Sequence, residues 1–422
     1  MGAGTAQRGA CLLISGKVRK NMEFVVFAGV LLLLFIFMIV QELIQTKNQE
    51  KLFKKYLREN YGKEPPKEYS LERFARLGSY LERHKEEKQL DDITWNDLGM
   101  DEVFRRIDRT YSAAGEEYLY YTLRNISCGR EALEHLEEVV NWLQEQENIK
   151  VRIQLLMKRL GHLGKYSLYD YLDNLDYLGE RSNRKIVLGN LLYLPFLLLL
   201  FVQPAMGTIG IVLCMLWHIM TYFREKKVIE PYIISFAYVL RLIDVCEELE
   251  KQKIPAYRRE LDELREALKS LRELRRGAYW VMAGNQGKIG GNPLDILADY
   301  LRMILHLDIF QFNRMLEKLR KKTGQVENML AITGYLDMAI SVGGFRKSLE
   351  GYCIPKLEED TEKAFLHMKK GWHPLLSQPV KNSIRADRGI LLTGSNASGK
   401  STFLKMVAVN AVLAQTIHTC AA

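Results

Sequence analysis

The sequence predicts a mainly α-helical chain that carries transmembrane helices and continues into the start of an α/β P-loop ATPase domain. Three observations lead to this fold class. Three uncharged apolar runs are each just long enough to cross about 30 Å of hydrocarbon as a helix. Leucine and valine recur at three- and four-residue intervals through most of the remaining chain. A glycine-rich loop lies between a short apolar run and an apolar helix near the C-terminus.

The composition indicates which binding partners and which cellular compartment suit the chain. The chain has 422 residues, and lysine plus arginine exceeds aspartate plus glutamate by 60 − 51 = +9. This excess suits nucleic acid or an anionic membrane surface, and it equally suits an ordinary solvated surface. Six cysteines are scattered without a C-x-x-C pair, which favours reduced, cytosolic thiols over a zinc site or a disulfide framework.

The three apolar runs are predicted to span a membrane. The first covers 24–40, and the second and third, 186–202 and 206–223, are joined by Gln203–Ala205 as a hairpin. Buried core helices are the alternative, and a signal peptide is a further one for the first run. No small-residue cleavage site follows Val40, which disfavours the signal peptide.

Basic flanks predict the orientation of these spans. Arg181–Lys185 precedes the hairpin and Arg224–Lys227 follows it, so both ends are expected in the cytoplasm at the cell membrane. Region 41–185 is then cytoplasmic, and the N-terminus is outside. Lys17–Lys20 conflicts with that placement, and a start at Met22 instead of Met1 would remove the conflict.

Polar residues inside the hairpin suggest local features. His218 is ionisable at membrane depth, which makes it a functional candidate, but a position near the interface also lets it reach water. We favour the interfacial interpretation. Asn190 and Pro195 predict a kink in the second run.

Helical periodicity covers the parts between the apolar runs. A juxtamembrane helix with a break at Pro65-Pro66 is expected over 48–89, and helices are expected from Asp91 to about Leu175. A long helix is predicted over 229–276, followed by a Gly-rich break and further helices over 294–348. The positions predicted to face a helical partner are Leu133, Leu136, Val139, Val140, Leu143, Leu261, Leu264, Leu268 and Leu271.

The segment "GSNASGKS" fits the phosphate-loop pattern G-x-x-x-x-G-K-[S/T]. Its glycines let backbone N–H groups point at phosphate oxygens, and the following helix presents its positive end to the same phosphates. Lys400 would contact the β- and γ-phosphates of ATP, and the Ser401 hydroxyl would bind Mg²⁺. A chance glycine-rich turn is the alternative. The predicted nucleotide-binding residues are Gly394, Ser395, Asn396, Ala397, Ser398, Gly399, Lys400, Ser401 and Thr402.

The residues on either side of this loop predict a strand and a helix, and they bear on whether ATP can be hydrolysed. "GILLT" at 389–393 is expected to be a buried parallel strand, and 401–416 an apolar helix. Hydrolysis needs an acidic residue on a second strand, and no aspartate or glutamate follows Ser401. We therefore expect a chain truncated within its ATPase domain, with no catalytic residue identified and no useful hydrolysis.

These motifs resemble the MutS mismatch-repair family. The loop carries the asparagine, the G-K-S-T core and the following aromatic of that family, and Ser398 resembles the membrane-associated MutS-related branch. "GWHPLL" (371–376) matches the family's His-Pro signature. Val380 falls near where repair enzymes place an aromatic against adenine, which puts base stacking in doubt.

The helical part resembles the MutS core. The segment 97–127 contains an aspartate-arginine-threonine run at 108–110 and then Gly115, and "YLDMAISVG" (335–343) resembles the helix that returns to the ATPase. No mismatch-reading domain with a Phe-x-Glu wedge fits before Asp97. The resemblance implies homodimerisation through complete ATPase domains, while DNA binding is expected to be weak and non-specific.

The predicted organisation follows from the spans and this resemblance. The parts are 1–23, an N-terminal segment; 24–40, a transmembrane helix; 41–90, a juxtamembrane linker; 91–185, the first core helices; 186–223, the transmembrane hairpin; 224–365, lever and core helices; and 366–422, the incomplete ATPase domain.

A membrane-anchored MutS-like ATP-binding protein is the function these features predict. An ABC-type transporter ATPase is one alternative, although helices rather than strands are expected before the loop. A non-enzymatic membrane scaffold is the other. DNA as the physiological partner is left open.

Overall fold

The computed structural model describes residues 37–38, 40–41, 44–64, 69, 71–86, 88–126, 129–163, 167–275, 300–358, 365–395 and 399–422. These residues divide into two compact units, Met1–Asn60 and Tyr61–Ala422. In the first unit, residues 44–60 form a single helix whose surface carries Lys–Glu pairs one turn apart. The predicted membrane segment at 24–40 lies almost wholly outside the described residues, and so do the N-terminal segment and Pro65-Pro66.

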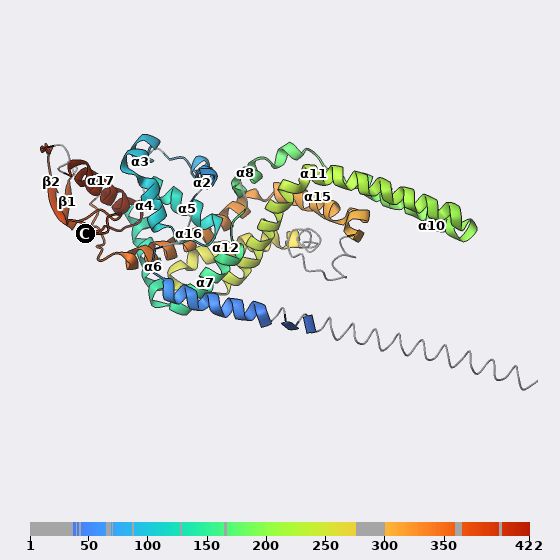
Figure 1. Cartoon of the computed structure of the whole chain (residues 1–422), viewed down its shortest axis with the longest axis horizontal. Helices are drawn as coiled ribbons and strands as arrows, with labels where there is room; N and C mark the ends of the chain where they lie inside the picture. Colours follow the sequence, from blue (N-terminus) through green and yellow to red (C-terminus); the bar gives the residue numbers. More distant parts are fainter. Residues whose placement is uncertain are drawn as a thin grey trace, which may run out of the picture. The chain divides into compact units, whose positions relative to one another are not determined.

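The second unit is built mainly from helices, as predicted (Figure 1). Its α-helices before the hairpin are α2 (Leu71–Arg83), α3 (Asp92–Leu98), α4 (Met100–Ile107), α5 (Ala113–Arg124), α6 (Arg130–Glu145), α7 (Glu147–Leu160) and α8 (Leu168–Asp173). The remaining elements are α9 (Arg184–Leu191), α10 (Tyr193–Val202), α11 (Pro204–Glu250), α12 (Arg258–Leu271), α15 (Leu307–Arg320), α16 (Thr323–Ser348), β1 (Leu366–Gly371), β2 (Asn382–Ala386) and α17 (Lys400–Thr416), with short 3₁₀ turns at Leu175–Leu178, Pro255–Tyr257 and Arg272–Arg275.

Helix α16 is the centre of the core. It packs along α5, α6 and α12, and it also contacts α11. Most of its side chains are buried, which suits a helix that is apolar on all sides. The leucines and valines predicted to face a partner on α6 and α12 are all buried, so that prediction is confirmed.

Glycines set the close approach of α5 and α16. A Cβ at Gly115 would lie 2.4 Å from Asp337 Oδ2, and one at Gly334 would lie 2.6 Å from the Ala114 carbonyl oxygen. Neither position has room for a side chain. Gly115, one of the residues that suggested the MutS resemblance, therefore has a packing role.

The long helix predicted over 229–276 differs from the observed helix α11 in where it starts and in where it ends. Helix α11 runs without a break from the hairpin turn through Glu250, so the third apolar run and the helix after it are one element. The helix predicted over 229–276 is instead interrupted after Glu250. The chain makes a 3₁₀ turn that begins at Pro255 and resumes as α12. Proline has no N–H to donate and favours the start of a new helix over continuation of the old one.

Helices α9, α10 and α11 form the predicted hairpin. The helix is interrupted at Leu192, because α9 ends at Leu191 and α10 starts at Tyr193, two residues before Pro195; the kink itself stays a prediction. By length and composition, Arg184–Val202 and Pro204–Glu230 could each cross a membrane. Among the described residues these are the two helices with that property, which is weak support for spanning.

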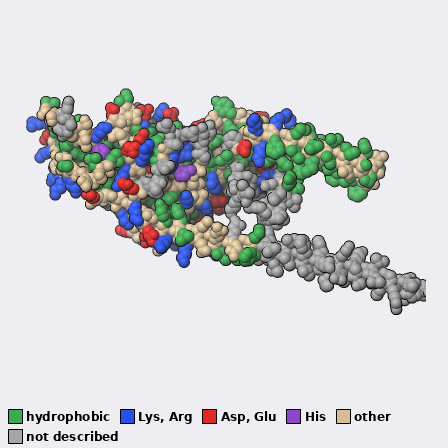
Figure 2. All heavy atoms as spheres, viewed as in Figure 1, with side chains coloured by type: hydrophobic (Ala, Val, Ile, Leu, Met, Phe, Trp, Pro, Cys, Tyr) green, Lys and Arg blue, Asp and Glu red, His purple; other side chains and the backbone are tan. Residues whose placement is uncertain are grey.

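The hairpin is apolar on its outside. Figure 2 shows green side chains covering the hairpin, which we call the arm (184–223), and only 6% of the segment Arg184–Val202 is buried. Inside the hairpin, small residues bring the two helices together. A Cβ at Gly207 would lie 2.6 Å from the Leu200 backbone nitrogen, and one at Gly210 would lie 2.1 Å from Phe196 Cδ1.

The two ends of the hairpin meet at α15. Arg181 forms an ion pair with Glu225 and donates a hydrogen bond to Asn313 Oδ1 at 3.1 Å. Asn183 Nδ2 donates to the Phe310 carbonyl oxygen at 3.0 Å. The basic segments before and after the hairpin therefore lie on the same side of it.

The His218 side chain does not reach water in this fold, contrary to the expectation that it would; its depth in a membrane stays a prediction. Its side chain is 1% exposed. The ring lies against Tyr193, Trp217 and His306, and its Nδ1 is 3.0 Å from the Cys214 carbonyl oxygen. The turn of helix that carries His218 faces α9, where Gly189 leaves room for the imidazole.

The antiparallel pair β1–β2 precedes the glycine-rich loop. Leu366 pairs with Ala386 and Met368 with Ile384, and the register is irregular before Gly371 pairs with Asn382. The sequence prediction had few strand signals here and expected helices before the loop. Strands before the loop therefore remove one reason for rejecting the transporter alternative.

Candidate nucleotide-binding loop and its junction with the helical core

Helix α17 starts at the lysine of the glycine-rich motif. Gly399 precedes it with φ 82°, a left-handed conformation that L side chains rarely adopt. No side chain caps this end of the helix, and Ser401 and Thr402 are exposed. The first-turn N–H groups have no partner within the helix, so this end can donate hydrogen bonds to an anion.

Lys400 reaches back to the start of the loop. Its Nζ donates hydrogen bonds to the carbonyl oxygens of Gly394 and Ser395, the latter at 2.7 Å. The ammonium group is thereby placed beside the loop and not along the helix. Asn396, Ala397 and Ser398 lie outside the described residues, so six of the nine predicted nucleotide-binding residues have a described position.

The segment 389–393 is not the buried strand that the sequence predicted. It is irregular and exposed, with Leu391 88% exposed. A buried parallel strand needs hydrogen-bonding neighbours on both sides. In the described part of the chain the only sheet is β1–β2, whose two strands pair with each other.

The His-Pro turn at 372–376 lies beside α17. Trp372 and His373 are both buried, and His373 anchors the turn because its Nδ1 accepts the Leu375 N–H at 3.3 Å. Burial, together with the positive charge of Lys405 on α17, lowers the pKa of His373. Val380, near the position where repair enzymes place an aromatic, is 77% exposed.

Asn410 connects this turn to α17. The residue is fully buried, and its Nδ2 donates to the Trp372 carbonyl oxygen at 3.0 Å. Its Oδ1 accepts the Ala421 N–H at 2.7 Å. Sequence analysis did not single out this residue, although a lone amide on an otherwise apolar helix face is a signal that could have found it.

Arg346 joins the end of α17 to the helical core. The side chain is fully buried on α16 and forms a two-pronged ion pair with Glu137 of α6, at 3.0 and 2.7 Å. It also donates to Thr419 Oγ1 at 2.9 Å and to the carbonyl oxygens of Ile417 and His418. One arginine therefore holds two core helices and the turn that follows α17.

The aspartate-arginine-threonine run at 108–110 forms a corner against α16. Asp108 Oδ1 accepts hydrogen bonds from the N–H and hydroxyl of Thr110. Asp337 of α16 accepts from the Ser112 N–H at 2.8 Å and from its hydroxyl at 2.7 Å. The two segments that suggested a MutS core are thus in direct contact, and this corner has a structural role.

The described residues contain no group of three or more His, Cys, Asp or Glu side chains that could hold a metal ion. Ser401 offers one exposed hydroxyl at the start of α17. Such a hydroxyl fits Mg²⁺ that arrives with a nucleotide, because Mg²⁺ in these sites takes most of its ligands from phosphate and water.

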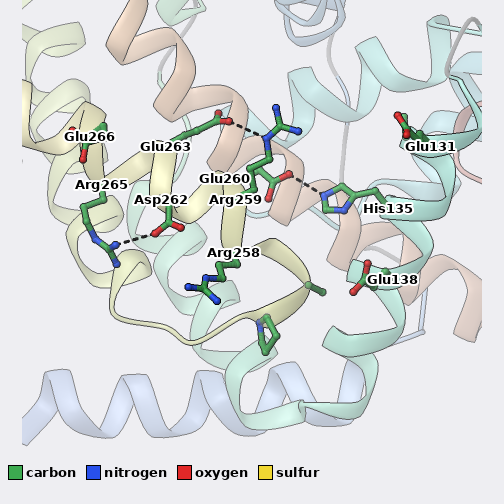
Figure 3. A pocket seen from close by; sticks show the side chains of 13 residues that line it. Glu131, His135, Glu138, Arg258, Arg259, Glu260, Asp262, Glu263, Arg265 and Glu266 are labelled. Carbon is green, nitrogen blue, oxygen red and sulfur yellow. Dashed lines mark hydrogen bonds and ion pairs between the residues drawn. The ribbon is translucent and has the colours of Figure 1, made fainter.

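A hollow among the described residues lies elsewhere, between α6 and α12 (Figure 3). It measures about 1200 Å³ and is lined mainly by charged side chains. These pair with one another: His135 with Glu260 at 3.0 Å, and Arg265 with Asp262 at 2.9 Å. We assign it no function, because several of its charges pair with one another and it is open to solvent.

Part of the chain is similar to MutS proteins. It is 28% identical over 123 residues to MutS protein homolog 4 of Homo sapiens, 31% over 124 residues to DNA mismatch repair protein MutS of Leptospira interrogans, and 33% over 115 residues to that of Pelotomaculum thermopropionicum. These similarities support a MutS relationship. No protein-family model matches the chain.

The similarity is limited in extent. The aligned segments cover 25–27% of this chain and only 12–14% of the relatives. The chain therefore matches a small part of proteins that are much longer than the aligned region.

Proposed function

We propose that the protein is a membrane-anchored, ATP-binding member of the MutS group, of the membrane-associated branch. The observation that carries this proposal is the position of Lys400. It follows a left-handed glycine at the start of a helix, and its ammonium group turns back over the loop that opens the motif. The similarity to MutS proteins over a quarter of the chain supports the choice of family.

In this proposal the loop residues 394–402 bind the phosphates of ATP. Lys400 exchanges its contacts with Gly394 and Ser395 for the β- and γ-phosphates. The N–H groups of the first turn of α17 donate to phosphate oxygens, and the Ser401 hydroxyl binds the accompanying Mg²⁺. Mg²⁺ would neutralise phosphate charge when bound.

The proposal concerns nucleotide binding, because hydrolysis in P-loop ATPases also needs an acidic residue on a second strand. Homodimerisation through complete ATPase domains and weak, salt-sensitive DNA binding are part of the same proposal, on the basis of the relatives named DNA mismatch repair proteins.

Membrane anchoring is proposed for the hairpin. Its outward side chains are apolar, and its basic ends meet at α15 on one side. The helical core and the loop then face the cytoplasm, and the turn at Gln203 faces outside.

Nucleotide binding can be tested with the full chain in detergent. We expect a fluorescent ATP analogue with Mg²⁺ to bind the native chain and to lose most of its affinity with Lys400→Ala. Lys405→Ala is the matched control, because Lys405 is exposed one turn further along the same helix. Equal binding by all three chains would refute the site and favour the scaffold alternative.

Topology can be tested by labelling intact cells with an impermeant thiol reagent. Gln203→Cys should be labelled from outside, whereas Tyr177→Cys should be labelled only after the cells are opened. Both native side chains are exposed, so accessibility does not bias the comparison. The reverse pattern would contradict the proposed orientation, and labelling of both from outside would contradict anchoring.

A further inference from the structure

Two cysteines far apart in the sequence lie directly opposite each other. The Cys353 N–H donates to the Cys420 carbonyl oxygen at 2.9 Å, and the Cys420 N–H donates to the Cys353 carbonyl oxygen at 3.0 Å. Such a pair of reciprocal hydrogen bonds places the two Cα atoms about 5.5 Å apart. Disulfides form at Cα separations of roughly 4.4–6.8 Å, so the Cα separation of this pair lies within the range for a disulfide.

The two thiols differ in exposure and acidity. Cys353 is exposed, whereas Cys420 is 8% exposed and its Sγ lies 3.6 Å from the Asn410 carbonyl oxygen. A hydrogen bond from the Cys420 thiol lowers the pKa of Cys353 to about 7, and the same contact together with burial raises the pKa of Cys420. The accessible sulfur is therefore the one that ionises near neutral pH, and the thiolate is the reactive form.

The other described cysteines lack this combination. Cys214 and Cys246 are both buried, and burial raises the pKa of Cys246 well above its usual value. All four described cysteines are free thiols in the structure. Oxidation is therefore expected to be selective for one pair.

We propose that Cys353 and Cys420 form a reversible thiol–disulfide pair whose oxidant is a hydroperoxide. The Cys353 thiolate attacks a peroxide oxygen; the O–O bond breaks, hydroxide leaves and a sulfenic acid forms. The Cys420 sulfur then attacks the Cys353 sulfur, the S–S bond forms, and the S–O bond breaks with loss of water. In total, two thiols and one hydrogen peroxide give one disulfide and two waters.

The bond would connect two segments that already meet. Cys353 follows α16, and Cys420 follows the turn that Arg346 binds. A covalent link at this point would fix the end of α17 to the end of α16. The inference does not depend on nucleotide binding, since it uses only the pairing of these two segments.

The test is peptide mapping of the full chain in detergent. Reduced protein is treated with hydrogen peroxide, free thiols are blocked, and the chain is digested with trypsin. Cleavage yields 348–356, which contains Cys353 alone, and 406–422, which contains Cys420 alone. We expect a linked species of these peptides, lighter than their sum by two hydrogen atoms, that disappears with dithiothreitol.

Variants and rates separate this pair from general oxidation. Cys353→Ser and Cys420→Ser should abolish the linked species, whereas Cys246→Ser should leave it unchanged. At pH 7, Cys353 in a Cys420→Ala background should lose part of its fast alkylation, because alanine has no donor to stabilise its thiolate. Peroxide treatment that yields sulfinic or sulfonic Cys353 without a linked peptide, or a linked peptide that includes Cys246, would overturn the proposal.

Discussion

The two halves of α11 have similar side chains and opposite surroundings. In the hairpin half, Leu213 is 61% exposed and Met220 is 67% exposed. In the core half, Leu242 and Leu249 are fully buried against neighbouring helices. One continuous helix thus leaves a protein interior and enters a region where protein covers little of it.

The difference shows what each half depends on. The core half is stabilised by burial against other parts of the chain, at about 25 cal/mol per Å² of apolar surface. In the hairpin half, the apolar surface is not covered by protein. A lipid bilayer is an apolar medium that could cover it. Mutations should therefore affect folding stability strongly in the core and weakly in the arm.

The largest effect is expected at the junction that completes the core. Arg346→Met removes the ion pair to Glu137 and leaves the carbonyl oxygens of Ile417 and His418 without this donor. Losing one partner of a buried ion pair costs about 3–5 kcal/mol of the free energy of unfolding. Denaturant unfolding in detergent measures it. Arg265→Met, which removes only surface pairs, is the control, and equal midpoints for both variants would contradict the role of Arg346.

A matched pair on α11 tests the comparison directly. Leu242→Ala should lower the free energy of unfolding by about 2–5 kcal/mol, because it opens a cavity in the core. Leu213→Ala should change it by less than about 0.5 kcal/mol, because that side chain has few protein neighbours. Both are measured by the same denaturant titration. Similar losses for the two variants would mean that the arm is packed against protein.

A buried carboxyl group makes the core, but not the arm, sensitive to pH. Burial raises the pKa of Glu117 to about 8, although Ser167 donates to it at 2.8 Å. Its neutral form is favoured in the folded state, so this contribution is full below about pH 4.5 and is lost as pH rises toward 8. Glu117→Gln should reduce the loss of stability between pH 5 and 8 by roughly 1–3 kcal/mol.

Thermal unfolding across that pH range gives the measurement for Glu117. The apolar arm has no carboxylate between residues 186 and 223, so its association with detergent should not follow the same pH curve. Identical pH profiles for the native chain and Glu117→Gln would contradict the assignment.

A smaller loss than in the core is expected where the two hairpin helices touch. Gly207→Ala places a Cβ 2.6 Å from the Leu200 backbone nitrogen, which cannot move aside as a side chain could. The two hairpin helices should separate, at a cost of about 1–2 kcal/mol. Gly324→Ala, with open space around it, is the control. Limited proteolysis near Gln203 should accelerate for Gly207→Ala alone, and unchanged cleavage would show that the hairpin tolerates the methyl group.

Sequence patterns predicted the features that depend on neighbours along the chain. The helical class, the buried leucines of α12 and the helix interruption before Pro195 follow from periodicity and from proline chemistry, which act over a few residues. The glycine and lysine that start α17 were likewise predicted from an eight-residue motif.

Only the tertiary structure decided which distant residues meet. Arg346 binding the turn after α17, Asn410 holding Trp372, and Cys353 facing Cys420 each join segments that no local pattern relates. The same is true of His218, which the sequence predicted to reach water and which neighbouring side chains bury. Periodicity specifies which face of an element is apolar, but contacts depend on which elements pack together. For that reason the sequence determined the helices and the loop motif, and the fold determined the junction between them.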